Sequence, residues 1–515
     1  MNSPYSRSNS AVLVGLHAVP VVVEGFLNKR SVVHDLDIVG LGDTAIKESR
    51  KRIRSVLSVH KWPFPSGNVV INLAPGDVRK EGTLLDLAMS LAVLSCAGII
   101  EKPLPADFFF FGELGLDGSL RKVKGLLPIL ISLAQRARES GEKLRVVVPE
   151  ENTCEAGLVP QLQVSTAAGL KQVVDALNDG SHFPVVQKGN QAQQFLAKAE
   201  TGLDFSEIHG HFQAKRAMEI AAAGGHNILL KGPPGSGKTM LARRMPTLLP
   251  LLGEKEFLQT ASIYSVVGLP IVVERPFRAP HHSASRSAII GGGTDARPGE
   301  VSLAHNGVLF LDEIPEFGRD VLEALRQPLE DGIVTISRAK QTVSYPAHFS
   351  LVCAQNPCPC GNYGDPEKEC TCSPRDIIRY NRKISGPLLD RIELVIEVPR
   401  LAYAEIRGQT SEESSESIRQ RVSQARQIQL SRFQEEAGVF TNANMNNRML
   451  KTHCALDAAG EKILEGSVRR FHLTGRGIHK ILKVARTIAD LAEKETILSI
   501  HVAEAVQFRE SILEG

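Results

Sequence analysis

A glycine-rich loop between an apolar run and a helical segment is the feature that most constrains the fold of this chain. GPPGSGKT follows NILLK and precedes MLARRMPTLLPLL. It matches G-x-x-x-x-G-K-[ST] in full: the glycines let backbone N–H groups close around phosphate oxygens, the lysine reaches the β- and γ-phosphates, and the hydroxyl reaches Mg²⁺. A strand before the loop and a helix after it place the phosphates at a helix N-terminus. The pattern predicts a nucleoside triphosphate site in an α/β fold, formed by Gly232, Pro233, Pro234, Gly235, Ser236, Gly237, Lys238 and Thr239.

A second motif, VLFLDEI from Val308 to Ile314, is an apolar strand that ends in adjacent carboxylates. Asp312 is expected to hold Mg²⁺ through its water shell, and Glu313 to polarise an attacking water. The alternative is a chance glycine loop followed by an unrelated acidic strand end, but both motifs occur here in the expected order. Together they predict hydrolysis of a nucleoside triphosphate, which we take to be ATP, with Mg²⁺ as a cofactor.

Length and composition limit the remaining possibilities. A chain of 515 residues predicts two or three domains. Because the formal net charge is only +3, any surface for nucleic acid must be local. No apolar run approaches the ~20 residues of a membrane span, and the N-terminal run AVLVGLHAVPVVVEGF predicts paired strands rather than a signal peptide. We therefore expect a cytoplasmic protein with no membrane partner, in which cysteines stay reduced.

Changes in sequence pattern along the chain predict its organisation. Residues 1–178 mix β-branched runs with helical stretches, as expected for one α/β domain. Residues 179–203 are polar and form a predicted linker, and residues 204–400 contain both ATPase motifs. Residues 401–515 are charged and helical in period, which predicts a C-terminal helical lid.

Three further segments resemble the AAA+ class of ATPases. The adjacent carboxylates are followed by FSLVCAQN, an apolar strand that ends near Asn356, and then by SGPLLDRIEL and HLTGRG. The resemblance implies that Asn356 is the first sensor, that Arg391 is offered to the ATP of a neighbouring subunit, and that Arg476 is the second sensor. For both arginines a surface ion pair is the alternative.

The segment between the acidic motif and Asn356 predicts a β-hairpin. VTIS and QTVS flank RAK, so Arg338 and Lys340 lie near the predicted tip. This resembles the pre-sensor hairpin of the AAA+ branch that contains magnesium chelatases and MCM helicases, where the tip enters a central pore and a cation can grip a DNA backbone. The alternative is a solvated basic turn.

The segment ERPFRAPHHSASRSAIIGGGTDARPGE resembles the helix-two insertion of the same AAA+ branch. It is rich in arginine and histidine. His281 and His282 receive no individual role, and structural hydrogen bonding is an equally good explanation for both.

Four cysteines are clustered at residues 358–372, within NPCPCGNYGDPEKECTCSP. Two C-x-C pairs separated by a Gly/Asp/Pro turn can bring four thiolates to one tetrahedral Zn²⁺, and such a closed site is structural. Reduced cysteines without a ligand, or redox or iron–sulfur chemistry, are the alternatives. The predicted zinc ligands are Cys358, Cys360, Cys370 and Cys372.

The N-terminal region resembles the proteolytic domain of the Lon protease family, in GDVRKEGTLLDLAMSLAVL and GELGLDGSLRKVKGLLPILISLAQ. The positions that match the serine nucleophile and the lysine base of that family are Leu84 and Leu127. Neither side chain can act as nucleophile or base. A Lon-like fold without the Ser-Lys dyad is therefore expected, and peptidase activity is not.

Taken together, these motifs occur in the order found in the ComM/YifB family of magnesium-chelatase-like AAA+ proteins, which the chain resembles from end to end. The implied fold class is α/β: a Lon-protease-like α/β domain, an AAA+ P-loop core with pre-sensor hairpin and helix-two insertion, and a helical lid. The resemblance also implies a hexameric, ATP-driven DNA helicase that promotes branch migration in homologous recombination and natural transformation. Its DNA would be single-stranded and branched or duplex.

Other activities remain open at this point. The ATPase core alone would also suit a magnesium-chelatase-type motor that acts on a protein partner, or a chaperone-like AAA+ protein that does no work on DNA. An ATP-dependent protease is disfavoured by Leu84 and Leu127. Stimulation of the ATPase by DNA separates the helicase from all three.

Overall fold

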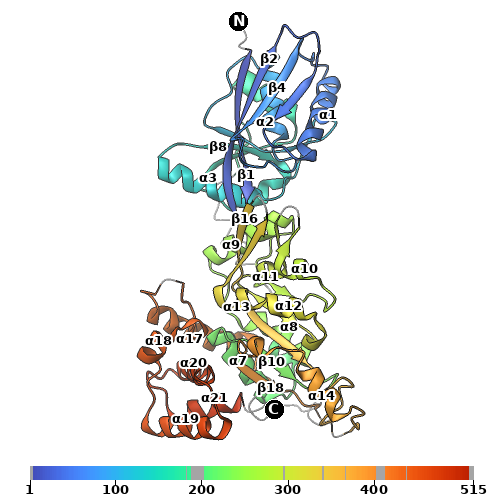
Figure 1. The fold of residues 1–515 in the computed structure, drawn as a ribbon. Coiled ribbons are helices and arrows are strands. Elements are labelled where there is room, and N and C mark those ends of the chain that lie inside the picture. The colour runs from blue at the N-terminus through green and yellow to red at the C-terminus, as the bar shows by residue number, and fades with distance from the viewer. Residues whose placement is uncertain are drawn as a thin grey trace. The chain divides into compact units, whose positions relative to one another are not determined.

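Two compact units make up the chain (Figure 1). Unit 1 consists of Met1–Lys198 and Glu254–Ile271, and unit 2 of Ala199–Gly253 and Val272–Gly515. The computed structural model describes residues 4–180, 183–186, 202–293, 296–338, 341–365, 367–401, 412–436 and 438–509.

A seven-stranded mixed sheet is the framework of unit 1, with strand order β3-β4-β2-β1-β5-β8-β9. The predicted N-terminal strand pair is present: β1 and β2 are antiparallel, from Tyr5 opposite Phe26 to Val14 opposite His17. On the other side of β1, strands β5, β8 and β9 run parallel to it. The strands are β1 (Tyr5–Val14), β2 (His17–Asn28), β3 (Leu36–Val39), β4 (Asn68–Ala74), β5 (Phe108–Phe110), β8 (Arg145–Pro149) and β9 (Gln163–Ala167), with the small pair β6 (Glu113–Leu114) and β7 (Leu120–Arg121).

Helix α2 (Asp86–Cys96) lies in the centre of unit 1. Its sequence DLAMSLAVLSC is apolar nearly all round, as expected for a helix buried on every side. Its one carboxylate, Asp86, is buried and forms an ion pair of 2.7 Å with Arg52 of α1. The other helices encoded before the linker are α1 (Thr44–Val59), α3 (Leu126–Ser140), α4 (Thr153–Ala156) and α5 (Leu170–Asp179), with the 3₁₀ turn η1 (Glu150–Asn152).

A later segment of the chain completes unit 1. Helix α9 (Glu254–Val267), which lies within the sequence of the ATPase region, packs on α3. The Gly125 N–H donates to the Ser265 carbonyl at 2.8 Å, and the Ser265 hydroxyl lies 3.4 Å from the Glu155 carboxylate. The chain therefore leaves unit 2 after the helix that follows the glycine-rich loop, contributes α9 to unit 1, and returns at Val272.

The predicted linker, residues 179–203, is described only in part. Val186 N–H donates to the Val164 carbonyl of β9 at 2.9 Å, and the Thr166 N–H donates to the Pro184 carbonyl. Residues 181, 182 and 187–201 lie outside the described residues. The described start of the segment is thus attached to the edge of the unit 1 sheet.

Unit 2 is built on a five-stranded parallel sheet in the order β11-β14-β17-β10-β18. The strands are short, and four of them are largely buried, as expected for a parallel sheet covered on both faces, whereas β11 at one edge is half-buried. Strand β17 lies between β10 and β14. Because their carboxyl ends lie at one edge, the residues that follow these three strands are brought together. The strands are β10 (Ile228–Lys231), β11 (Phe277–Arg278), β14 (Val308–Leu311), β17 (Ser350–Gln355) and β18 (Leu394–Glu397).

The C-terminal helices belong to the same compact unit as this sheet. Helices α17 and α20 pack on α7, and α17 also packs on α8, so one hydrophobic core extends from the sheet into the helical region. In this region Asp490 is buried, and its charge is paired with Arg432 at 2.5 Å and Arg486 at 3.0 Å.

The helices of unit 2 are, in chain order, α7 (Phe212–Gly224), α8 (Lys238–Leu248), α10 (Arg286–Ile290), α11 (Glu300–Leu303), α12 (Arg319–Ala324), α13 (Arg326–Asp331), α14 (Pro374–Asn381), α15 (Gly386–Leu389), α17 (Ser415–Arg432), α18 (Asn447–His453), α19 (Ala458–Phe471), α20 (Gly475–Leu491) and α21 (Ser499–Gln507). The 3₁₀ turns are η2 (Phe205–Glu207), η3 (Ile314–Glu316) and η4 (Asn442–Asn444).

Two β-hairpins project from the region around the sheet. The predicted hairpin is present as β15 (Ile333–Arg338) and β16 (Gln341–Pro346), which pair in register from Ile333 opposite Pro346 to Arg338 opposite Gln341. The insertion forms a second, smaller pair, β12 (Gly291–Gly292) and β13 (Arg297–Pro298). Ile336 of β15 approaches Gly291 so closely that a Cβ on the glycine would lie 2.9 Å from it. The two hairpins therefore pack together.

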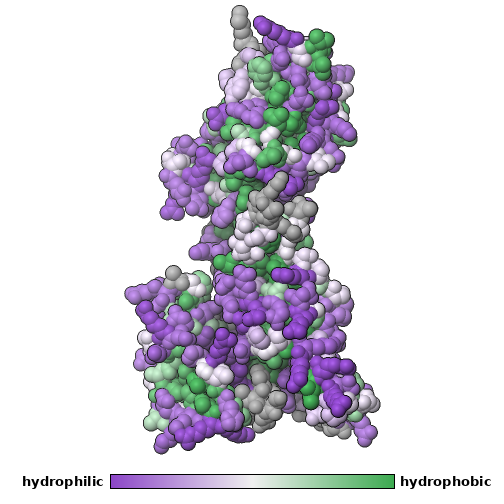
Figure 2. Space-filling view, viewed as in Figure 1, coloured by the Kyte–Doolittle hydropathy of each residue, from purple (hydrophilic) through white to green (hydrophobic). Residues whose placement is uncertain are grey.

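The molecular surface in view is mainly hydrophilic, and its apolar residues form separate patches (Figure 2). Among the described residues no helix combines the length and the apolar character needed to cross a membrane. The predicted α/β fold class, with a parallel-stranded core and a helical C-terminal region, is confirmed.

Candidate nucleotide-binding site

The glycine-rich loop joins β10 to α8, as the sequence predicted. Gly232 lies against the chain that follows β18, where a Cβ would stand 2.1 Å from the Val398 carbonyl oxygen, so only glycine fits. Gly235 has φ of +79°, and a Cβ on it would meet no atom within 4 Å. The inner side of the loop is therefore open. The buried Ser236 hydroxyl has no hydrogen-bond partner among the described residues.

The Lys238 ammonium group is folded into this loop. It donates to the carbonyls of Gly232 and Pro233, both at 2.8 Å, and to the Asn356 side-chain oxygen at 3.2 Å. Burial lowers the pKa of Lys238, and the nearby Asp312 and Glu313 carboxylates partly oppose this shift. An amine held among three oxygens, under an open loop of N–H donors, fits the phosphates of a nucleotide.

The end of β14 supplies the oxygen atoms that suit Mg²⁺. The Thr239 hydroxyl, in the first turn of α8, donates to Asp312 Oδ2 at 2.9 Å. Mg²⁺ prefers one or two protein oxygens and completes its shell with waters and phosphate oxygens. The hydroxyl and carboxylate are thus close enough to serve one ion.

Glu313 is exposed and stands where the chain turns from β14 into η3. Its φ of +49° is a left-handed conformation that non-glycine residues adopt rarely and that is often found at functional sites. Asn356 follows β17, the strand between β10 and β14, and its side chain contacts Lys238. The structure therefore brings Lys238, Thr239, Asp312 and Asn356 to one edge of the sheet, with Glu313 adjacent.

The four clustered cysteines lie close together directly after Asn356. Their sulfur atoms all lie within 4.8 Å of one another, with separations of 3.3 Å for Cys358–Cys360 and 3.7 Å for Cys360–Cys370. A tetrahedral Zn²⁺ with bonds of about 2.3 Å separates its sulfurs by about 3.8 Å. Backbone N–H groups of Asn362 and Thr371 hold the pKa of Cys360 well below its usual value, at about 5. This donor set fits Zn²⁺.

Residues 358–372, which carry the four cysteines, are called the cysteine loop below. Helix α14 follows this loop and leads back to the acidic motif. Lys383, just beyond it, forms an ion pair of 3.1 Å with Glu316 of η3, and Gln355 donates to Asn381 at 2.8 Å. Burial and the carboxylates of Glu316 and Glu313 raise the pKa of the Tyr380 phenol, which stays neutral. These contacts could not be predicted from the sequence, because Tyr380 and Lys383 stand in an ordinary basic stretch.

Among the described residues, the contacts of the two predicted arginines do not involve the phosphate loop. Arg391 forms an ion pair with Glu330 of α13 and donates to the Pro387 carbonyl at 2.5 Å. Arg476 is 74% exposed and lies 3.7 Å from Asp390, the neighbour of Arg391 in sequence. Both arginines therefore form ion pairs within their own chain.

The predicted DNA contacts are only partly described. Arg338 is the last residue of β15, opposite Gln341, and Lys340 lies outside the described residues. Val334, Ile336, Val343 and Tyr345 lie buried on one face of the hairpin, and the alternate residues of β15 from Ile333 to Ser337 are exposed. The rings of His281 and His282 lie tilted to one another with their centroids 4.1 Å apart, and His282 contacts the ring of Phe317 beyond η3 edge-on, which places the insertion near the acidic motif.

Leu84 and Leu127, the positions that correspond to the Lon nucleophile and base, are both buried. Leu127 N–H lies 3.3 Å from the Ser265 hydroxyl of α9, so this part of unit 1 is used for packing.

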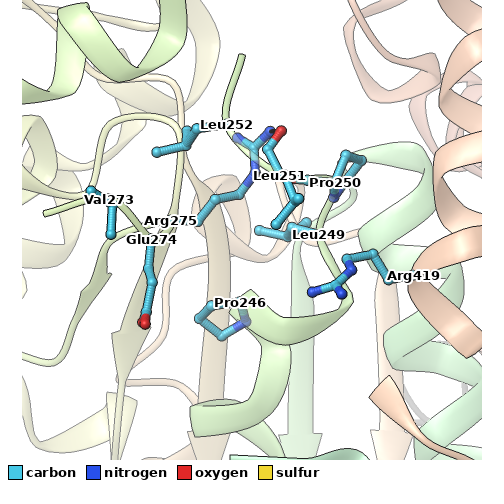
Figure 3. A pocket seen from close by; sticks show the side chains of 9 residues that line it. All are labelled: Pro246, Leu249, Pro250, Leu251, Leu252, Val273, Glu274, Arg275 and Arg419. Atoms are coloured by element: carbon cyan, nitrogen blue, oxygen red, sulfur yellow. Dashed lines mark hydrogen bonds between the residues drawn. The ribbon is translucent and has the colours of Figure 1, made fainter. Parts of the chain in front are cut away.

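A pocket in unit 2 is lined by residues that precede and follow the segment Glu254–Ile271, together with Arg419 (Figure 3). Arg275 donates to the carbonyls of Pro250, Leu251 and Asn306, and Arg419 pairs with Glu416. The two arginines that line the pocket are thus engaged by other groups of the chain, and we assign the pocket no ligand. Its lining residues are Pro246, Leu249, Pro250, Leu251, Leu252, Val273, Glu274, Arg275 and Arg419.

Three features of the parallel sheet define an AAA+ ATPase core. They are the phosphate loop after β10, the carboxylates after β14, and the asparagine after β17, the strand between these two. Known families match this chain in three segments: residues 204–406 match "Magnesium chelatase, subunit ChlI", residues 412–509 match "Magnesium chelatase, subunit ChlI C-terminal", and residues 27–152 match "Subunit ChlI of Mg-chelatase".

Individual relatives agree over nearly the whole length. Competence protein ComM of Haemophilus influenzae is 40% identical over 98% of this chain and 96% of its own. Uncharacterized protein YifB of Escherichia coli is 41% identical over 96% of this chain and 95% of its own. DNA replication licensing factor Mcm2 of Drosophila melanogaster is 24% identical over 44% of this chain and 24% of its own. The chain belongs to the ComM/YifB family of magnesium-chelatase-like AAA+ ATPases, so the resemblance inferred from the motifs is confirmed, and ATP and Mg²⁺ are the cofactors that this class implies.

Proposed function

We propose that this chain is an ATP-driven DNA helicase or translocase that assembles as a hexamer and promotes branch migration in homologous recombination and natural transformation. Its DNA would be single-stranded and branched or duplex, and we place it in the cytoplasm, where DNA and reduced thiols occur together. The observation that supports this most is the near-full-length similarity to a protein named as a competence protein. The similarity to a DNA replication licensing factor supports DNA as the substrate.

The roles of the site residues follow from their positions. We propose that the loop N–H groups and Lys238 hold the phosphates, that Thr239 and Asp312 hold Mg²⁺, and that Glu313 activates water, which Asn356 helps to orient. The Mg²⁺ would neutralise charge on the phosphates. Arg391 would act on the ATP of a neighbouring subunit, and Arg476 would be the second sensor.

A motor that acts on a protein partner is the second candidate function. The family descriptions that match this chain are named for a magnesium chelatase subunit, and such a subunit has the same kind of core. The relative named as a magnesium-chelatase 38 kDa subunit, however, matches only 30% of this chain. ATP hydrolysis measured with and without single-stranded and branched DNA separates the two, since only a DNA motor is expected to be stimulated.

Changing Arg338 and Lys340 together to alanine is expected to weaken DNA binding for all sequences alike. The tip would contact the sugar-phosphate backbone, which carries no sequence information. On single strands, each phosphate contact removed should make the negative slope of log K against log salt shallower by about 0.7. Hydrolysis without DNA should persist, because neither residue belongs to the phosphate loop, while DNA stimulation and strand unwinding should fail. Filter binding over a salt series and an unwinding assay measure this.

A matched control removes two cations elsewhere. Lys462 and Arg469 on α19 are both exposed, and their joint replacement by alanine should leave the salt slope unchanged. If the hairpin variant keeps the native slope and unwinds DNA normally, the DNA contact lies on another element.

We also propose that the four clustered thiolates hold Zn²⁺. About one zinc ion per chain is expected by metal analysis, and Cys358→Ser or Cys372→Ser should lose it, because removing one ligand opens a closed tetrahedral site. Cys154→Ser is the control, since that cysteine is exposed and outside the cluster. Protein purified without chelator that contains no zinc would contradict the proposal.

A further inference from the structure

The cysteine loop packs directly on the phosphate loop. Gly361, between the two cysteine pairs, has φ of +84°, and a Cβ on it would lie 2.6 Å from the Cγ and Cδ atoms of Pro234. No side chain other than hydrogen fits between these two loops. A shift of the cysteine loop is therefore transmitted to the middle of GPPGSGKT.

One side chain joins the two loops across this contact. Arg400 Nη2 donates to the Pro234 carbonyl at 3.4 Å, and its Nε lies 3.2 Å from Asp365 Oδ2 in the cysteine loop. A third nitrogen, Nη1, lies 3.5 Å from Glu367. The planar guanidinium can serve several acceptors at once, which a lysine ammonium on a flexible stem does less well.

The positive charge of Arg400 compensates the buried carboxylate of Asp365. The Asp365 side chain is fully buried, and the Glu367 N–H donates to its other oxygen at 2.9 Å. A buried carboxylate without a cation is costly, so loss of Arg400 is expected to move the loop that carries Asp365.

Arg400 also belongs to the segment that supports the back of the phosphate loop. Val398 N–H donates to the Lys231 carbonyl at 2.6 Å, and the Val398 carbonyl lies against Gly232. Lys231 ends β10, and Lys238 donates to Gly232 and Pro233. The segment from Val398 to Arg400 thus contacts the loop at Lys231, Gly232 and Pro234, before the residues that would face phosphate.

We infer that Arg400 is a positioning residue that holds the phosphate loop and the cysteine loop in one arrangement, so that nucleotide binding and metal binding at the thiols favour one another. This inference rests on the proposed ATP and zinc sites. Coupling between two sites is reciprocal: if zinc strengthens nucleotide binding by some factor, nucleotide strengthens zinc binding by the same factor. Arg400 touches neither ligand and acts through Pro234 and Asp365.

The first test uses the zinc-loaded full chain and a fluorescent ATP analogue. Arg400→Ala should raise the Kd for the analogue and the KM for ATP about fivefold or more, while kcat changes little because Glu313 and Asn356 are untouched. Arg400→Lys should recover only part of the loss. Asp365→Asn should weaken binding similarly, and the double variant should be no worse than either single one. Arg379→Ala is the control, because that side chain is 82% exposed and pairs only with Asp376 among the described residues.

The second test measures the linkage itself. Release of zinc to a chromophoric chelator should slow about fivefold when the non-hydrolysable analogue is bound, and this effect should vanish in Arg400→Ala and persist in Arg379→Ala. The inference would be overturned if the effects of Arg400→Ala and Asp365→Asn on nucleotide affinity were additive. It would also be overturned if bound nucleotide did not change the rate of zinc release from the unaltered chain. Absence of zinc or of nucleotide binding in the unaltered chain would overturn the linkage together with the proposed function.

Discussion

Lys238→Ala is expected to abolish ATP binding, whereas Glu313→Gln is expected to leave binding intact and stop hydrolysis. Lys238 lies inside the phosphate loop, hydrogen-bonded to Gly232 and Pro233, so its ammonium group can contact phosphate in the ground state. Glu313 stands after the strand, exposed and next to Asp312, where it can act on water without holding the nucleotide. Equilibrium binding of a fluorescent ATP analogue and steady-state phosphate release measure the two effects separately.

Asp320→Asn is a matched control for the carboxylate. Asp320 is exposed in the first turn of α12, seven residues after Glu313 in the sequence, and is expected to be dispensable for turnover. Turnover of ATP by Glu313→Gln at the native rate would remove Glu313 from its proposed role. Normal nucleotide affinity in Lys238→Ala would do the same for Lys238.

Local patterns predicted the elements that local contacts form. The strand pair β1–β2 and the hairpin β15–β16 each connect neighbouring runs of alternating residues through a short turn, and both are present. The loop from Gly232 to Thr239 is likewise a strand–turn–helix unit that one stretch of sequence specifies. Clustering of the four cysteines followed from their spacing alone, because a short loop cannot place them far apart.

Contacts between distant segments could not be predicted. Ser265 of α9 and its partner Glu155 are 110 residues apart in sequence, so nothing local indicates that α9 belongs with the N-terminal unit. The same holds for Arg391 and Glu330, 61 residues apart, and for Arg400 and Pro234, 166 residues apart. The two arginine contacts depend on how the parallel strands of unit 2 are ordered in the sheet, which a motif at the end of one strand does not reveal.

The proposed zinc site and the proposed ATP site are linked by one continuous segment of the chain. Asn356, Cys358 and the loop up to Cys372 follow β17 without a break, and α14 then returns to Glu316 through Lys383. One short stretch therefore contacts the phosphate loop, the acidic motif and the four thiols. In this arrangement a structural metal would stiffen the part of the pocket that the proposed sensor occupies.

Arg391→Ala is expected to reduce ATP hydrolysis by about 10³-fold, with nucleotide binding largely kept, because an arginine supplied to a neighbouring site stabilises charge in the transition state. A mixture with Lys238→Ala chains should recover activity. Each active site would combine Lys238 of one subunit with Arg391 of the next, so about a quarter of the interfaces in a random equal mixture are intact. Phosphate release from each variant alone and from the co-assembled mixture measures this.

The ion pair with Glu330 gives the control that separates catalysis from structure. Arg391 is 12% exposed and bound to Glu330 and Pro387 in its own chain, so its loss could act by disturbing α13. Glu330→Gln breaks the same ion pair and keeps the arginine. If Arg391 serves only as the partner of Glu330, both variants lose activity alike and the mixture stays inactive. If Arg391 acts across a subunit interface, Glu330→Gln retains hydrolysis, since a freed guanidinium needs no rupture of an intrachain pair before it reaches the neighbouring ATP.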